Sequence, residues 1–124
     1  MSSKAILSIG IDGDHPLMKT MPTAPSAEFI RQGIADARIA THEAGFTGFR
    51  FVELKPETCA DELAELLREK HWDALIIGGG FKLVPGFITQ LKDVVNTTKN
   101  LSPKTQILFT SLPSTIIDSA RRVK

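Results

Sequence analysis

Four short apolar runs alternate with four helical patterns along the chain, and this alternation constrains the fold more than any other feature. The runs are rich in Ile, Leu, Val and Phe and cover residues 5–11 (AILSIGI), 48–54 (GFRFVEL), 73–77 (DALII) and 105–110 (TQILFT). Strands that alternate with helices are typical of a parallel sheet covered by helices on both faces. The chain is therefore expected to be an α/β protein.

Segments with apolar residues at helical spacing follow each of these runs. Ser26 is expected to cap the first helix and Gly45 to end it, because these residue types favour those positions. The second helix is expected to bury Cys59, Leu63, Leu66 and Leu67, and the third Ile88, Leu91, Val94 and Val95. The four predicted helices cover residues 26–44, 56–70, 85–98 and 113–123.

Right-handed crossover connections favour the sheet order 2-1-3-4 for such a chain. The expected architecture is a single three-layer α/β/α domain over residues 1–124, with a four-stranded parallel sheet of the Rossmann-like or flavodoxin-like type that lacks a fifth strand. The run GFRFVEL alternates in hydropathy, which places the second strand near an edge. The fourth strand is expected to be covered by the C-terminal helix or by a second copy of the chain, so a homodimer is predicted.

Composition excludes several classes of function. The 124 residues are 42% hydrophobic and carry a formal charge of +1, and the basic residues are dispersed, so no nucleic-acid partner is expected. No apolar stretch approaches the roughly 20 residues that span a bilayer, so no membrane partner is expected either. Cys59 is the single cysteine and is interpreted as a small buried hydrophobic residue. A reducing, cytoplasmic location is the expectation.

Polar and glycine-rich segments follow the predicted strands at the edge of the sheet where parallel α/β proteins bind ligands. The first connection is about 14 residues long and opens with Asp-Gly-Asp-His-Pro, and the third strand is followed by three glycines, phenylalanine and lysine. The ligand-binding candidates are Asp12, Gly13, Glu53, Gly78, Gly79, Gly80, Lys82, Ser111 and Ser114, and the catalytic candidates are Asp14 and His15.

Each candidate also has a structural interpretation. The Asp-Gly-Asp segment suits a turn, the glycines suit close packing of a helix, and Ser111 and Ser114 suit helix capping. His15, which precedes a proline, also suits an exposed loop. These alternatives stay open at the level of the sequence.

Three hypotheses for the function follow. In the first, the chain binds a small polar or anionic ligand: the glycine amides and Lys82 take the negative group, while Asp12 and Asp14 take hydroxyls, an amine or a divalent cation. In the second, it is an enzyme in which Asp14 or His15 is the acid or base, Asp12 orients His15 or a metal, and Lys82 stabilises negative charge. In the third, it is a structural or regulatory homodimer. No cofactor is identified, and no metal site is assigned.

Several known motifs do not match. The segment after the first strand lacks the G-x-G-x-x-G turn of nicotinamide sites, and GGGFKLVPG lacks the Gly-Lys-Ser/Thr of a P-loop. Asp12-x-Asp14 resembles the first motif of haloacid-dehalogenase-type phosphatases, but the chain ends before their magnesium-binding strand. Response-regulator receivers require a phosphorylatable aspartate where this chain has Gly78 to Gly80.

Over most of its length the chain resembles a family of small single-domain α/β proteins without a known activity. The segments SIGIDGDHP, RQGIADARIATHEAGF, HWDALIIGGGFK and ILFTSLPS carry the resemblance. It implies the fold and no catalytic residue or cofactor.

Overall fold

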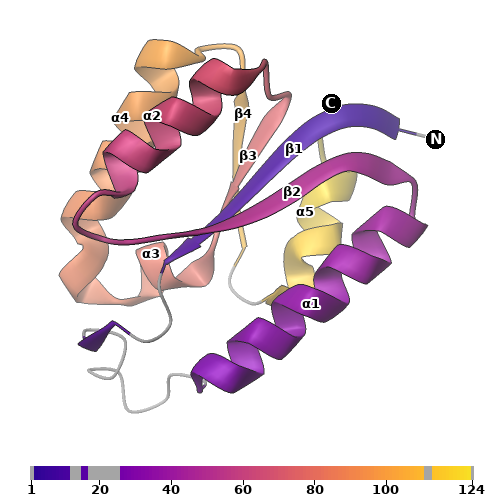
Figure 1. Ribbon diagram of the computed structural model, residues 1–124, viewed down its shortest axis with the longest axis horizontal. Coiled ribbons are helices and arrows are strands. Elements are labelled where there is room, and N and C mark those ends of the chain that lie inside the picture. The colour runs from indigo at the N-terminus through magenta and orange to yellow at the C-terminus, as the bar shows by residue number, and fades with distance from the viewer. Residues whose placement is uncertain (1, 12–14, 17–25, 111–112, 124) are drawn as a thin grey trace.

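The computed structural model describes residues 2–11, 15–16, 26–110 and 113–123, which include a four-stranded parallel sheet. The strands are β1 (Ser2–Ile11), β2 (Phe46–Leu54), β3 (Ala74–Ile77) and β4 (Gln106–Phe109). Their order across the sheet is β2-β1-β3-β4 (Figure 1). The predicted strand order and the edge position of the second strand are therefore confirmed.

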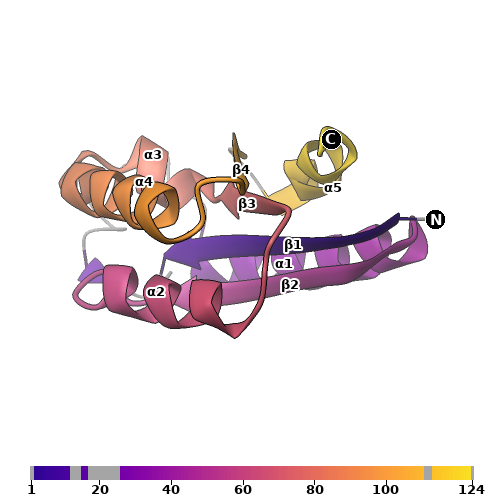
Figure 2. The ribbon, with the colours of Figure 1, turned by 90° about the horizontal axis from the view of Figure 1, so that it is seen from above.

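Helices cover both faces of the sheet in a three-layer α/β/α arrangement, as predicted. They are α1 (Ala27–Glu43), α2 (Cys59–Glu69), α3 (Gly79–Leu83), α4 (Ile88–Leu101) and α5 (Ile116–Arg121), with 3₁₀ turns η2 (Pro85–Phe87) and η3 (Pro113–Thr115). Buried residues of α2, α3 and α4 share one apolar cluster with β1 and β3, whereas those of α1 and α5 share another. Figure 2 shows α2 in front of β1 and β2 and α1 behind them.

The helix α1 begins after Ser26 and ends before Gly45, as predicted. The Ser26 hydroxyl oxygen accepts a hydrogen bond from the Phe29 N–H at 3.1 Å, which satisfies one of the free amides of the first turn. Gly45 follows the helix with φ of 98°, a backbone conformation that favours glycine. The chain can therefore turn directly into β2.

The second helix begins at Cys59, three residues later than predicted. Residues 56–58 form a turn instead, and the Glu62 carboxylate holds it by accepting from the Thr58 hydroxyl and from the Lys55 N–H, both at 3.0 Å. The predicted buried face is confirmed, because Cys59, Leu63, Leu66 and Leu67 are all at most 7% exposed.

The third helical segment is split, and two predictions about it are wrong. A loop was expected at the glycines after β3, but the structure has the short helix α3 there, and this helix begins at Gly79 and Gly80. The 3₁₀ turn η2 separates α3 from α4. Burial of Phe81 and Phe87, both 0% exposed, outweighs the poor helix propensity of glycine here. Ile88, expected in the buried stripe of the helix, is 52% exposed.

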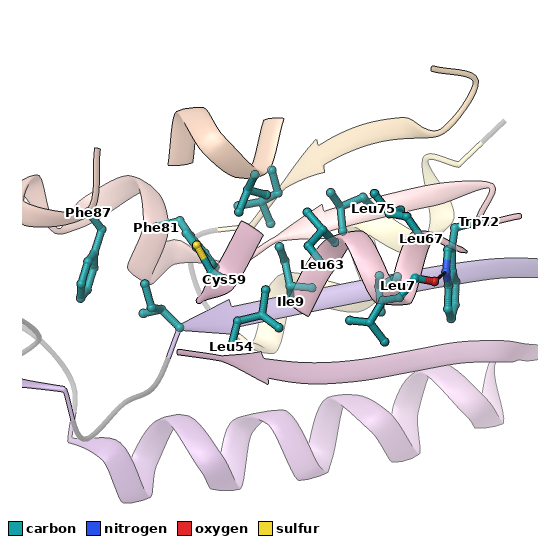
Figure 3. Packing of buried hydrophobic residues seen from close by; sticks show 14 of the residues in the cluster. Leu7, Ile9, Leu54, Cys59, Leu63, Leu67, Trp72, Leu75, Phe81 and Phe87 are labelled. Carbon is teal, nitrogen blue, oxygen red and sulfur yellow. Dashed lines mark hydrogen bonds between the residues drawn. The ribbon is translucent and has the colours of Figure 1, made fainter. Parts of the chain in front are cut away.

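The larger apolar core lies between the sheet and α2, α3 and α4 (Figure 3). Leu7 and Ile9 of β1 face it and are fully buried. At its far end Trp72 is 1% exposed, and its indole N–H donates to the Leu66 carbonyl oxygen at 2.9 Å. This bond satisfies the one polar atom of the indole ring, so the ring can be buried without an unpaired donor.

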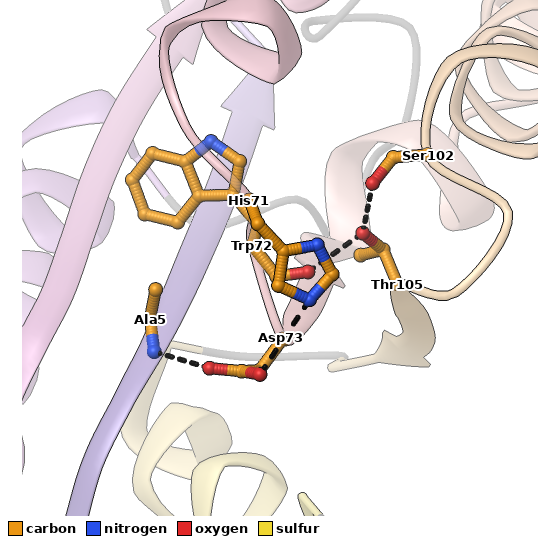
Figure 4. Close-up of polar contacts among 6 residues, drawn as sticks. All are labelled: Ala5, His71, Trp72, Asp73, Ser102 and Thr105. Atoms are coloured by element: carbon orange, nitrogen blue, oxygen red, sulfur yellow. Dashed lines mark hydrogen bonds and ion pairs between the residues drawn. The ribbon is translucent and has the colours of Figure 1, made fainter.

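The chain around Asp73 ties three strands together at the amino end of the sheet (Figure 4). The Asp73 carboxylate accepts the Ala5 N–H at 2.8 Å, and the Asp73 carbonyl oxygen accepts the Gln106 N–H at 3.0 Å. The Thr105 hydroxyl donates to the Trp72 carbonyl oxygen at 2.7 Å. These contacts set the register of β1, β3 and β4 at the edge away from the predicted site.

The fourth strand forms the other edge of the sheet, with α5 beside it. Leu108 packs with Ile116 and Ala120 of α5, and the Ser119 hydroxyl donates to the Phe109 carbonyl oxygen at 3.4 Å. The C-terminal helix therefore packs against this strand, while the Phe109 side chain is 41% exposed.

Candidate functional site

The carboxyl ends of the parallel strands lie along one edge of the sheet, called here the carboxyl edge. The helix that follows β1, α1, lies on one face of the sheet, and the helix that follows β3, α3, lies on the other. Since β1 and β3 are neighbours, the helices that follow them change face between these two strands. Open α/β sheets bind ligands at such a point. A ligand site is therefore expected at the carboxyl edge beside β1 and β3.

The predicted site residues divide into two sets. Asp12, Gly13, Asp14 and Ser111 lie outside the described residues, and so does the side chain of Lys82, whose backbone belongs to α3. The described set is His15, Glu53, Gly78, Gly79, Gly80 and Ser114.

His15 is held in place by two residues from other parts of the chain. Its Nε2 lies 2.9 Å from the Oε1 of Glu57, and its ring meets the Phe87 ring edge-on, with centroids 5.4 Å apart. Only 18% of the His15 side chain is exposed, against 67% for Glu57. The imidazole is thus a partly covered, oriented group that hydrogen-bonds to a carboxylate at the carboxyl edge.

Glu57 is a functional candidate that the sequence reasoning missed. It lies in the turn between β2 and α2, and the pattern there was interpreted as the start of a helix. Its own backbone N–H and the hydrogen bond with His15 lower the pKa of the Glu57 carboxyl below its ordinary value of 4.5. The group is therefore an anion at neutral pH, which suits it to orient an imidazole.

Gly78 is explained by packing against β1. Its N–H donates to the Ile9 carbonyl oxygen at 2.9 Å, and a Cβ atom at this position would lie 2.9 Å from the same oxygen. A side chain would therefore push β1 and the turn after β3 apart. Gly79 and Gly80 continue into α3 and leave its first two positions without side chains.

Glu53 lies on the opposite face of the sheet from His15. Its carboxylate oxygen is 3.9 Å from a guanidinium nitrogen of Arg31 on α1. His15, by contrast, contacts Phe87, which belongs to the core beneath α2, α3 and α4. The structure therefore does not bring Glu53 and His15 together.

Ser114, like Glu53, lies on the face of the sheet that α1 covers. It is exposed in η3, which packs against α1. In the same region the hydroxyls of Thr110 and Thr115 are hydrogen-bonded to each other, and the Thr110 N–H donates to the Ile77 carbonyl oxygen at 3.0 Å. The described candidates thus form two groups on the two faces of the carboxyl edge.

The Cys59 thiol lies in the core near the start of α2 and is 2% exposed. Burial raises the pKa of this thiol, and the negative charge of Asp93 raises it further. Because the thiolate is the reactive form, Cys59 is an inert core residue, and its predicted burial is confirmed.

Among the described residues, no three or more His, Cys, Asp and Glu side chains cluster in a way that could hold a metal ion. No helix in this part of the chain combines the length and apolar character that crossing a bilayer requires.

Comparison of the chain with protein-family models, with curated proteins and with solved structures finds no match in any of the three.

Proposed function

We propose that the chain binds a small polar or anionic ligand at the carboxyl edge, between the segment that follows β1 and the first turn of α3. The observation that carries the proposal is the His15 imidazole, oriented by Glu57 and covered on one side by Phe87. A histidine held in this way has a defined direction for hydrogen bonding, which a freely exposed loop histidine lacks.

The surroundings of His15 favour particular chemical groups. The ionised Glu57 favours a hydroxyl or an amine on the ligand, because a carboxylate only accepts hydrogen bonds. On the other side, Gly79 and Gly80 leave the start of the α3 backbone open to close approach, and the proposal assigns the negative group of the ligand to these backbone amides and to Lys82. A small molecule with a hydroxyl or amine at one end and a negative group at the other fits this arrangement best.

The same pair of residues favours an acid/base enzyme as the second candidate. A carboxylate that orients a histidine is the arrangement by which many enzymes set the direction of a general base. In that case His15 is the acid or base, and Glu57 is the positioning residue. The two candidates differ in whether the bound molecule is changed.

A thermal-shift panel tests the binding proposal. Divalent metals, nucleotides, sugar phosphates, carboxylates and flavins are added to the wild type and to His15→Gln and Glu57→Gln. A ligand at 100 times its Kd stabilises the folded state by about 2.7 kcal/mol, which raises Tm by roughly several degrees in a chain of this size. We expect a compound of one class to raise the Tm of the wild type but not of His15→Gln or Glu57→Gln.

The matched control is His71→Gln, since His71 is an exposed histidine at the amino end of the sheet, away from the carboxyl edge. It should respond like the wild type. A panel with no shift for the wild type, or a shift that both site variants retain, contradicts the proposal. A compound that shifts Tm is then incubated with the protein and analysed by mass spectrometry: a changed compound supports the enzyme, and an unchanged one supports the binding protein.

We also propose that the protein is a cytoplasmic homodimer. Phe109 supports the dimer, because it is an apolar side chain 41% exposed on the edge strand β4. The single cysteine, which is buried, supports a reducing compartment. Sedimentation velocity at micromolar concentration should give a dimer, and Phe109→Lys should give a monomer. A wild-type monomer contradicts this part of the proposal.

A further inference from the structure

The outer edge of β2 carries a groove that lies away from the carboxyl-edge site. β2 pairs with β1 on one side, and among the described residues no strand pairs with its other side. The groove has a volume of about 410 Å³. Its lining consists of Arg38, His42, Phe46, Phe49, Arg50 and Phe51.

The ionisable residues that line this groove are all of basic type. Two arginines and a histidine line it, and no carboxylate does. Arg38 donates to the Phe51 carbonyl oxygen at 3.1 Å and lies over the Phe51 ring at 5.6 Å, while Arg50 pairs with Glu69 of α2 at 3.1 Å. Each guanidinium has five N–H donors, so one such bond does not exhaust it. The groove is therefore complementary to negative charge.

The two arginines reach the strand edge from opposite faces of the sheet. Arg38 belongs to α1, and Arg50 of β2 pairs with Glu69 of α2. Figure 2 shows that α1 and α2 lie on opposite sides of β2. In an extended strand, adjacent side chains point to opposite faces. A strand added beside β2 would therefore present one residue to Arg38 and the next to Arg50.

The aromatic part of the groove is held rigidly by β1. A Cβ atom at Gly10 would lie 2.8 Å from the Phe51 ring, so the ring occupies the space over Gly10 where a side chain would be. Phe46 and Phe49 pack against the core under α1 and α5. The groove thus offers fixed apolar surface beside an edge strand that no second strand pairs among the described residues, and Arg38 holds the Phe51 carbonyl oxygen of this strand. Proteins bind extended peptides by adding a strand to such an edge.

From this geometry we infer that the β2 edge binds an extended peptide segment with two adjacent acidic residues. The peptide backbone pairs with β2, one acidic side chain meets Arg38 and His42, and its neighbour meets Arg50. Apolar residues of the peptide lie on the phenylalanines. This site is independent of the ligand proposed at the carboxyl edge.

Fluorescence anisotropy with a defined peptide tests the inference. The probe is a fluorescein-labelled ten-residue peptide with two adjacent glutamates at its centre and alternating valine and threonine on either side. The comparison peptide has glutamines in place of the glutamates. We expect the wild type to bind the glutamate peptide at least tenfold more tightly, and added salt to weaken that binding.

Three variants assign the binding to the groove. Arg38→Gln and Arg50→Gln should each weaken the binding at least tenfold, whereas Arg68→Gln, an exposed arginine of α2 outside the groove, should not. Circular dichroism checks that each variant is folded. Equal binding of the two peptides, or binding that neither groove variant weakens, overturns the inference.

Hydrogen exchange of the wild type gives a second readout that needs no variant. The peptide should slow amide exchange in β2 and leave the exchange in β4, the other edge strand, unchanged. Slowing at β4 alone would overturn the inference. Self-association of the wild type that Arg50→Gln abolishes would also overturn it, because a second copy of the chain would then be the occupant.

Discussion

Asp73 and Ala5 are joined by two hydrogen bonds. The Asp73 N–H donates to the Ala5 carbonyl oxygen at 2.8 Å, and the Asp73 carboxylate accepts the Ala5 N–H at 2.8 Å. Asp73 therefore extends the pairing of β1 and β3 by one residue before the start of β3, with one hydrogen bond from its backbone and one to its side chain.

Replacing Asp73 should lower the free energy of unfolding. In Asp73→Ala the Ala5 N–H loses its acceptor, and we expect a loss of about 1–3 kcal/mol, the usual cost of leaving such a donor unpaired. Urea unfolding followed by circular dichroism measures it. Asp93→Ala, at an exposed position of α4, is the control and should change stability by less than about 0.5 kcal/mol. Equal unfolding midpoints for the two variants would contradict the expected effect.

Adding a methyl group at Gly78 should destabilise the protein in the absence of any ligand. In Gly78→Ala the new Cβ atom would lie 2.9 Å from the Ile9 carbonyl oxygen, and both groups belong to backbone that cannot move independently. The expected cost is about 1–3 kcal/mol, as for other overpacked sites. Urea unfolding provides the measurement. An unchanged midpoint would show that the glycine is not required by packing.

The contribution of Glu57 to stability should depend on pH. The pKa of Glu57 is lower in the folded protein than its ordinary value of 4.5, so the folded state binds the proton less tightly. Its contribution is therefore fully present above pH 4.5 and is lost as the pH falls through the lower, folded pKa.

The test compares urea midpoints of the wild type and Glu57→Gln from neutral pH down to pH 3. The wild type should be more stable at neutral pH, and the difference should shrink in the acid range. Glu43→Gln, at an exposed position near the end of α1, is the matched control. A difference for Glu57→Gln that stays constant across the whole range would contradict the prediction.

The Cys59 thiol should react slowly in the folded protein. Burial raises its pKa, so the thiolate is scarce, and the sulfur lies in the core behind α2. We expect a disulfide reagent at pH 8 to modify the native protein at least 100-fold more slowly than the protein in urea, because reaction requires opening of the core. Comparable rates in the two conditions would place the thiol at the surface.

Local patterns were enough to predict the strands, their order and the face of α2 that is buried. Cys59, Leu63, Leu66 and Leu67 recur at helical spacing, and this spacing alone determines which side of the helix is apolar. The start of α3 could not be predicted in this way. Three consecutive glycines favour a loop, and the helix forms because Phe81 becomes buried in a core built by distant segments.

The candidate site also depends on contacts between distant segments, which local sequence patterns do not predict. His15 was predicted from its place after the first strand, but its partner Glu57 is 42 positions further along the chain. No spacing rule connects the two residues, since the fold brings them together through the connection of β1 to β2. Glu53 was predicted for the same edge, yet strand alternation directs it toward Arg31 on the opposite face.

The central place of β1 has a consequence for how the protein folds. β1 leaves the ribosome before either of its neighbours, because residue 46 is the first to pair with it and residue 74 begins the next pairing. Until then Leu7 and Ile9 have no core to enter, since their cluster is built from β3, α2 and α4. Every strand pairing in the sheet joins residues more than 30 positions apart, so we expect folding to be slower than in helical proteins and to require contacts between both halves of the sequence.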